Sequence, residues 1–322
     1  MNDTNDYTIE SYSSGDNHAW DNFLNETVNS SFLFSRKFLS YHGNRFIDKS
    51  LMVYDSKKRL IALFPAAPDP KNNKEIVSHP GISYGGLIHK ESLKGAAILD
   101  VLERILEFYK RDGYSKLLYK VMPHIYHKKP CEDEQYALFR LGAQRYRCDL
   151  SASIFLDSRG KVSERRRRAL NKARKANLTV DFDNGVLPEY WNILSQNLEQ
   201  RHGAKPVHSL DEIVHLSDHF EDSIRLVSVR ENNQMVAGVL LFETEIVSHA
   251  QYIAASKRGF ELSALDMVFY ECIRRAQSND KRYFDFGISN EHDGAVLNAG
   301  LYQYKVEYGA GGVIHDFYEL NL

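Results

Sequence analysis

Two stretches near the end of the chain decide its fold: Tyr283-Phe284-Asp285-Phe286-Gly287-Ile288, and Gly300-Leu301-Tyr302-Gln303-Tyr304-Lys305-Val306-Glu307-Tyr308-Gly309. The first stretch is rich in aromatic residues and ends at a glycine and the polar loop 289–294, which predicts a buried strand. In the second stretch, apolar and aromatic residues recur at three- and four-residue spacing, as on a helix with one apolar face. Lys305 lies beside that face.

Asp285 and Gly287 stand at the carboxyl end of the predicted strand. Ligands of open α/β sheets are usually held at that edge, because side chains and helix amino termini converge there. The sequence therefore makes Asp285 and Lys305 candidates for a site. The alternative is that Asp285 is an ordinary polar residue and that Lys305 extends its ammonium to the surface.

Length and composition limit the class of protein. With 322 residues, 43% hydrophobic and 26% charged, the chain has the composition of a globular protein and the length of two domains. No apolar run reaches the roughly 18 residues that span a bilayer, and the polar amino end lacks a secretory signal. We therefore expect a cytoplasmic protein without a transmembrane segment. Cys131, Cys148 and Cys272 are too scattered for a disulfide framework or a thiolate metal site.

Charge is unevenly distributed along the chain. The window 161–175 contains eight basic residues and one acid, so it carries +7, and subtracting this from the net charge of −2 leaves −9 for the rest. A basic segment on an acidic body favours a local anionic contact and argues against a DNA-binding protein. Arg165, Arg168 and Lys172 follow helical spacing on one side, which suits phosphates of a donor; the alternative is a solvated helix face.

The order of elements suggests a duplication. The first half reads as strands 51–54, 60–65 and 75–79, a helix 92–112 and a strand 116–121. The second half reads as a strand 146–155, helices 163–176 and 188–201, strands 224–229, 235–243 and 245–255, a helix 263–276 with a capping-box pattern at Ser263, and the strand 283–288. Both halves share strands, a helix and a further strand, so residues 1–150 and 151–322 are predicted to be two similar domains.

The pair of units resembles the Gcn5-related N-acyltransferase (GNAT) fold in tandem, specifically the Fem-type (FemABX-like) transferases and their BioF2-like acyltransferase relatives. Three places carry the resemblance: the arginine-rich segment 165–178, the strand Tyr283–Gly287 and the helix Gly300–Gly309. It implies an α/β (α+β) fold of two GNAT-like domains, each a mixed twisted sheet flanked by helices. It also implies transfer of an acyl or aminoacyl group from a thioester or a tRNA ester to an amine.

By this resemblance, Lys305 matches the lysine of the family's Phe-Lys-x-x-Phe-Gly-like helix, while Asp285 and Gly287 match its Asp-Phe-Gly-like strand end. Lys305 would then face a donor phosphate or the oxyanion that develops during aminolysis, where a positioned cation lowers the barrier. Asp285 is a candidate general base. Acyl-CoA is the expected co-substrate, and we expect no bound cofactor.

One segment departs from the superfamily pattern. The usual pyrophosphate loop, Gln/Arg-x-x-Gly-x-Gly/Ala, offers backbone N–H groups at a helix amino terminus. Here the segment is Ser256-Lys257-Arg258-Gly259-Phe260-Glu261-Leu262-Ser263-Ala264, with one glycine and a glutamate. We expect Lys257 and Arg258 to contact donor phosphates in place of the missing amides.

The loop 201–209 contains two further base candidates, His202 and His208, because an imidazole titrates near neutral pH. The alternative is a surface loop in which Ser209 caps a helix through Glu212.

Other polar residues are candidates for substrate contact. His249 and Gln251 are two positions apart on a strand, so they are predicted to share a face, with Tyr252 on the other. Tyr84, beside two glycines, and His124 are candidates for acceptor binding. No third ligand accompanies His124 and its neighbouring histidine, so a metal site is not predicted.

These observations favour an N-acyltransferase that acts directly on an amine acceptor, either a small molecule or an amine linked to lipid or sugar, such as a cell-envelope or polysaccharide precursor. Two alternatives remain open at this stage. The first keeps the fold but takes aminoacyl-tRNA as the donor, as in peptidoglycan-type bridge formation. The second is a non-catalytic binding module in which Lys305 holds structure only.

Overall fold

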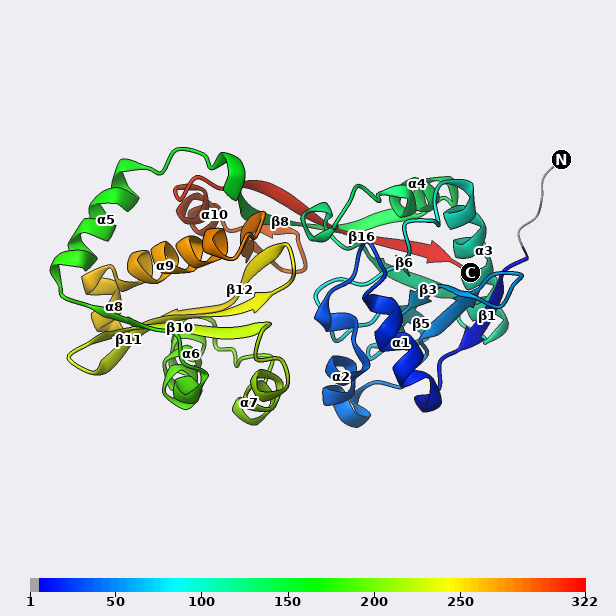
Figure 1. Cartoon of the computed structure of the whole chain (residues 1–322), viewed down its shortest axis with the longest axis horizontal. Helices are drawn as coiled ribbons and strands as arrows, with labels where there is room; N and C mark the ends of the chain where they lie inside the picture. Colours follow the sequence, from blue (N-terminus) through cyan, green and yellow to red (C-terminus); the bar gives the residue numbers. More distant parts are fainter. Residues whose placement is uncertain (1–5) are drawn as a thin grey trace. The chain divides into compact units, whose positions relative to one another are not determined.

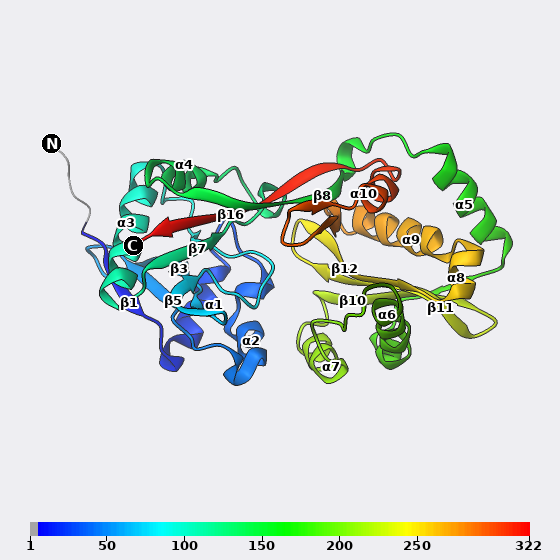
Figure 2. The same cartoon turned by 180° about the vertical axis from the view of Figure 1, so that it is seen from behind.

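The computed structural model describes residues 6–322, apart from the side chains of Arg201 and His202. Contacts divide the chain into two units (Figures 1 and 2). Unit 1 comprises the residues up to Asp149 together with 292–295 and 314–322, and unit 2 comprises 150–291 and 296–313. The main boundary thus lies beside the predicted one at 150, while two short segments from the second half of the chain belong to unit 1.

Unit 1 is built from short strands and four helices, of which the 16-residue helix α3 is the longest. Its helices are α1 (Asn17–Leu24), α2 (Arg36–Leu39), α3 (Ala96–Arg111) and α4 (Asp133–Arg140). Its strands are β1 (Thr8–Ser11), β2 (Leu51–Tyr54), β3 (Leu60–Phe64), β4 (Ala67–Asp69), β5 (Asn72–Val77), β6 (Ile88–His89) and β7 (Lys116–Lys120). Two long strands, β8 (Gln144–Phe155) and β16 (Gly311–Asn321), contribute residues to both units.

The strands of unit 1 form two sheets, one in the order β1-β2-β3-β6 and one that includes β4-β5-β7-β16. Helix α3 packs on them through the predicted face, in which Ile98, Val101, Ile105 and Tyr109 are fully buried. The spacing of these residues places them on one side of the helix, so their burial accounts for its position.

Unit 2 contains the longer elements. Its helices are α5 (Glu164–Lys175), α6 (Leu187–His202), α7 (Leu210–His219), α8 (Lys257–Leu262), α9 (Ala264–Ser278) and α10 (Ala299–Val306). Its remaining strands are β9 (Thr179–Asp181), β10 (Ile224–Glu231), β11 (Gln234–Glu243), β12 (Val247–Ala255), β13 (Tyr283–Ile288), β14 (Asn290–Glu291) and β15 (Val296–Leu297).

A mixed sheet in the order β8-β13-β12-β11-β10-β9 forms the centre of unit 2. Helix α9 lies on one face of this sheet and α6 on the other (Figure 1). Because both faces are covered, Phe284 and Phe286 of β13 and Phe269 of α9 are buried, with the rings of Phe269 and Phe286 centred 5.0 Å apart. The predicted strand 283–288 and the mixed sheet flanked by helices are confirmed.

Strands β12 and β13 are parallel neighbours, and they pair over only three residues each, Val247–His249 with Tyr283–Asp285. Strand β12 continues to Ala255 along β11, where the register shifts beside Gln251. Gly287 of β13 has φ +77°, a conformation that favours glycine. The two parallel strands therefore part directly after His249 and Asp285.

Unit 1 contains a comparable parallel pair, β5 and β7, joined over Glu75–Val77 and Lys116–Leu118. Beyond this pairing the chain itself continues the contacts with β7. The amide of Ser78 donates to the Leu118 carbonyl, the amide of Gly85 donates to the Lys120 carbonyl, and the Lys120 amide donates to Ser78 Oγ. Segment 78–85 thus occupies in unit 1 the place where strands part in unit 2.

Two features were not foreseen from the sequence. The predicted helix 263–276 is preceded by the separate short helix α8, and Ser263 adopts a left-handed conformation (φ +59°) between the two without the predicted capping bond. The final strand β16 was also missed. No described helix is both long enough and apolar enough to cross a membrane.

Candidate active site

Lys305 is buried on α10, with 3% of its side chain exposed. Its ammonium donates hydrogen bonds to the carbonyls of Gly287 (2.8 Å) and Ile288 (2.6 Å), at the end of β13. Burial lowers the pKa of Lys305 to about 8, an effect that the negative charge of Asp285 opposes. The alternative of a lysine that extends to the surface is therefore wrong, and the cation is fixed beside the strand end.

Asp285 is fully buried and connects three strands. Its Oδ1 accepts a hydrogen bond from Ser151 Oγ on β8, and its Oδ2 lies 2.8 Å from Nδ1 of His249 on β12. His249 and Asp285 are direct partners in the parallel register, which accounts for their contact. The side chain of His249 is 18% exposed. One side of its ring contacts the buried carboxylate of Asp285, at the residue pair after which β12 and β13 part.

The arginine helix α5 is attached to the unit by Arg166, which is buried although its neighbours are exposed. Its Nη1 lies 3.0 Å from Asp266 Oδ1 on α9, and its Nε lies 3.0 Å from Glu307 Oε2 after α10. Tyr308 donates to the same Asp266 oxygen at 2.9 Å. Burial raises the pKa of Asp266, and the charge of Arg166 opposes this. Arg166 therefore anchors α5 on α9 and α10.

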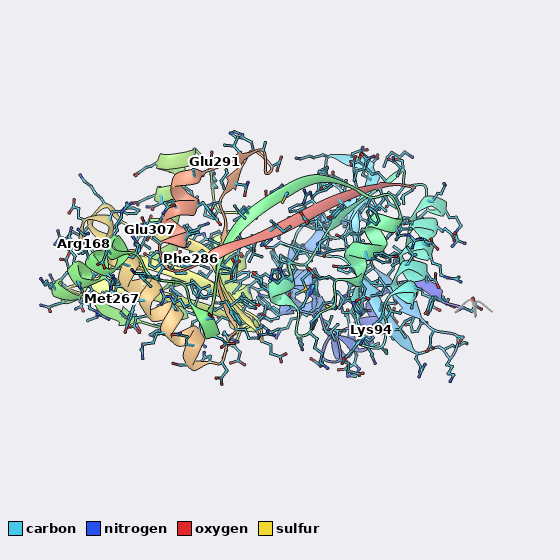
Figure 3. All side chains as sticks on the ribbon, turned by 90° about the horizontal axis from the view of Figure 1, so that it is seen from above. Lys94, Arg168, Met267, Phe286, Glu291 and Glu307 are labelled. Atoms are coloured by element: carbon cyan, nitrogen blue, oxygen red, sulfur yellow. The ribbon has the colours of Figure 1, made fainter. Side chains whose placement is uncertain are left out.

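The three cations predicted to bind donor phosphates, Arg165, Arg168 and Lys172, are exposed on the opposite side of α5 (Figure 3 labels Arg168 and Glu307). Arg165 lies 3.5 Å from Glu307, whereas Arg168 and Lys172 project from the helix surface. Their predicted role as a phosphate contact stays a prediction, and their exposure is compatible with it.

The segment predicted to replace the pyrophosphate loop is α8. Arg258 is held by two acids, with 2.7 Å between its Nη2 and Glu231 Oε1 and a longer contact to Glu261. Ser256 Oγ accepts the Gly259 amide, and a methyl group on Gly259 would lie 2.0 Å from the Val236 carbonyl oxygen. Gly259 thus allows close packing on β11, and the guanidinium of Arg258 is matched by carboxylates. Lys257 is exposed.

His208 is buried and lies beside Tyr252, with 2.6 Å between His208 Nδ1 and the Tyr252 hydroxyl. Burial raises the pKa of Tyr252 to about 12, while a hydrogen bond from Gln251 opposes this shift. The register pairs His249 with Phe242 and Tyr252 with Leu240, two positions apart on β11, so His249 and Tyr252 share a face and the predicted placing of Tyr252 on the other face is wrong. Gln251 is the residue without a partner in this register, and its predicted role stays a prediction. Ser209 caps α7 through Glu212, as the alternative for this loop predicted.

The side chain of His202 lies outside the described residues. The two predicted acceptor contacts, Tyr84 and His124, belong to unit 1. Tyr84 is buried against Phe34 and Tyr126, with ring centres 5.8 and 4.7 Å away, which identifies a packing role. His124 is exposed. In residues 6–322, no group of three or more His, Cys, Asp or Glu residues is placed to hold a metal ion.

Unit 1 also contains a cavity of about 490 Å³, which the sequence did not indicate because its lining comes from several separate segments. Arg36 lies in its wall, 94% buried, with its guanidinium 3.4 Å from the ring centre of Tyr12 and 2.6 Å from Asp48. Lys37, His42 and His79 also line it. Burial lowers the pKa of His79 to about 3, so this ring is neutral near pH 7. The lining suits a polar ligand.

Residues 158–306 match the family model described as an acetyltransferase (GNAT) domain. Over these residues the chain is similar to that family. The match covers α5 to α10 and therefore includes β12, β13 and Lys305. The matched residues are therefore similar to an acyltransferase domain. No curated protein sequence matches the chain significantly.

Solved structures extend the likeness to the whole chain at the level of fold. FemX is 12% identical, with a TM-score of 0.68 over 98% of this chain and 97% of that chain. The C-terminal domain of a putative lysylphosphatidylglycerol synthetase from Agrobacterium fabrum is 9% identical, with a TM-score of 0.62 over 96% and 92%. A tandem GNAT protein of the clavulanic acid biosynthesis pathway is 7% identical, with a TM-score of 0.55 over 98% of both chains. The predicted Fem-like tandem GNAT fold is confirmed.

Sequence reasoning missed two residues of unit 2 that the structure makes prominent. Ser151 has no local signal, because its contact with Asp285 crosses 134 positions. Arg166 did have one: Leu170 and Ala173 follow it at four- and seven-residue spacing, which marks the inward side of α5. Within the basic run, this spacing could have distinguished Arg166 from its exposed neighbours.

Proposed function

We propose that the chain is an N-acyltransferase that moves an acyl group from an acyl-CoA thioester to an amine, and that the reaction takes place in unit 2. The observation that carries this proposal is the buried ammonium of Lys305, fixed at the carbonyls of Gly287 and Ile288 directly after β12 and β13 part. The acetyltransferase family of residues 158–306 supports the reaction class.

The chemistry requires the arrangement seen there. The amine nitrogen forms a bond to the thioester carbonyl carbon, a tetrahedral oxyanion develops, and the carbon–sulfur bond then breaks so that the thiolate leaves with the electron pair. An ammonium has three N–H donors, of which two bind main-chain carbonyls. We assign the third to the oxyanion, and one such donor in a preorganised site contributes on the order of 10²–10³ in rate.

Unit 1 supports the assignment to unit 2 by contrast. In unit 1 the place after the parallel pair is taken by segment 78–85, through hydrogen bonds to β7. A methyl group on Gly85 would lie 1.9 Å from the Ser78 carbonyl oxygen, so the backbone is closely packed there. We therefore assign no donor site to unit 1.

Aminoacyl-tRNA as the donor is the second candidate. It is favoured by the exposed cations of α5, which suit a polyanion, and by the fold shared with a domain of a putative lysylphosphatidylglycerol synthetase. The weakly acidic remainder of the chain favours the smaller donor.

Calorimetric titration with acetyl-CoA, a long-chain acyl-CoA and charged tRNA separates these candidates. We expect an acyl-CoA to bind, and an amine panel to release free thiol from it. Lys305→Met should lose thiol release, while Lys120→Met serves as the matched control, because Lys120 also donates to two main-chain carbonyls, those of His79 and Ile82 in unit 1. Binding of charged tRNA alone would replace the proposal with the second candidate, and binding of no donor would contradict both.

A further inference from the structure

His249 and Asp285 form a pair whose geometry suits proton transfer rather than substrate contact alone. Asp285 is fully buried, with one oxygen bound by Ser151 and the other by His249 Nδ1. A carboxylate accepts hydrogen bonds only, so the Nδ1 atom of His249 carries the proton. The neutral ring then has its lone pair on Nε2, the form that can act as a base.

The far edge of the His249 ring lies at the position where the reaction is proposed. A methyl group on Gly287 would be 3.3 Å from Cε1 and 4.0 Å from Nε2 of His249. The carbonyl of the same Gly287 accepts the ammonium of Lys305 at 2.8 Å. The base edge of His249 and the cation of Lys305 thus flank one glycine residue, where the strands part.

This arrangement matches the two demands of aminolysis. The amine must lose a proton, and the carbonyl oxygen must gain a stabilised negative charge. We propose that His249 Nε2 takes the proton of the attacking amine, that Asp285 positions His249, and that Ser151 positions Asp285; this rests on the proposed function. The proton moves from nitrogen to Nε2 as the carbon–nitrogen bond forms, and it is passed on to the leaving thiolate.

The other base candidates fit less well. Asp285 is fully buried with both oxygens engaged, so it is a positioning residue. His208 is bound to the hydroxyl of Tyr252. Around the pair, Phe242 is the partner of His249 on β11, and Ser151 of β8 contacts Asp285.

The test uses the full chain with two variants and a control. His249→Gln should lower kcat by about 10²–10⁴-fold with donor binding unchanged, since general base catalysis contributes that much. His219→Gln, an exposed histidine on α7, should retain wild-type kcat.

A second measurement does not depend on turnover. Imidazole ¹⁵N NMR should show His249 as the Nδ1–H tautomer, and Asp285→Asn should abolish that preference if the variant folds. An Nε2–H tautomer in the wild type, or a His249→Gln variant with the wild-type rate, would overturn the relay. Failure of every donor to bind would instead contradict the proposed function, and the NMR result would still decide the geometry of the pair.

Discussion

Replacing Lys305 with methionine should change how stability depends on pH. Burial lowers the pKa of Lys305 from 10.5 to about 8. Below pH 8 the lysine is protonated in both the folded and the unfolded chain, so the folded state bears the full cost of the buried cation. Between pH 8 and 10.5 only the unfolded chain binds this proton, so the free energy of unfolding rises with pH by about 1.4 kcal/mol per unit. The whole window is worth about 3 kcal/mol.

The variant lacks this increment. At pH 7, Lys305→Met removes the buried cation but leaves two carbonyls without their donor, at about 1–3 kcal/mol each, so the two effects offset each other to within about 3 kcal/mol. Relative to the wild type, the variant should then lose about 3 kcal/mol by pH 10.5. Groups such as Lys120 titrate in both proteins and cancel in the difference.

Urea denaturation at several pH values measures this difference. The chain contains two tryptophans, Trp20 in unit 1 and Trp191 in unit 2, so a Trp20→Phe background leaves Trp191 to report on unit 2. A constant difference in unfolding free energy between pH 7.5 and 10.5 would refute the reasoning. Activity at pH 7 should fall on the order of 10²–10³-fold, far more than the change in stability explains.

Three further outcomes follow from the packing. Arg166→Leu should lower the free energy of unfolding by about 3–5 kcal/mol, because it leaves the buried carboxylate of Asp266 without its cation, whereas Arg168→Ala should change it by less than about 0.5 kcal/mol; urea denaturation distinguishes them. Gly259→Ala should cost about 1–3 kcal/mol by forcing a methyl group against a main-chain oxygen, while Gly311→Ala, with open space around it, should be tolerated; a thermal melt that ranks them the other way would contradict the packing. Burial raises the pKa of Glu134 to about 7, so between pH 4.5 and 7 the wild type should lose about 3 kcal/mol relative to Glu134→Gln as pH rises, and equal denaturation midpoints across this range would count against it.

Periodic elements were predictable because each buries a regular set of side chains. The face of α3 and the strand Tyr283–Ile288 have the spacing of their structures, and burial then fixes them. Strand β16 was not predictable in the same way, since His315, Asp316 and Glu319 interrupt its apolar pattern. The break at Ser263 depends on a left-handed residue that a capping-box pattern conceals.

The candidate site was predictable residue by residue but not as an arrangement. Lys305, Asp285 and His249 were all identified, but His249 and Asp285 were given separate roles because they are 36 positions apart. Their pairing depends on the register of two parallel strands, which local sequence does not specify. Likewise, the sequence indicated a cation at position 305, whereas its burial depends on the packing of α10 at the end of β13.

The segment 78–85 of unit 1 has a consequence for stoichiometry. The backbone of this segment is hydrogen-bonded to β7, in the place that corresponds to the proposed donor entrance of unit 2. Two similar domains therefore do not imply two reaction centres. A tightly binding donor analogue should therefore saturate at one equivalent per chain. Substitutions that open segment 78–85 should not create a second donor site, unless a cation is also placed where Lys305 lies in unit 2. Under the proposed function, unit 2 carries the reaction, and the residues of unit 1 are free to diverge in what they bind.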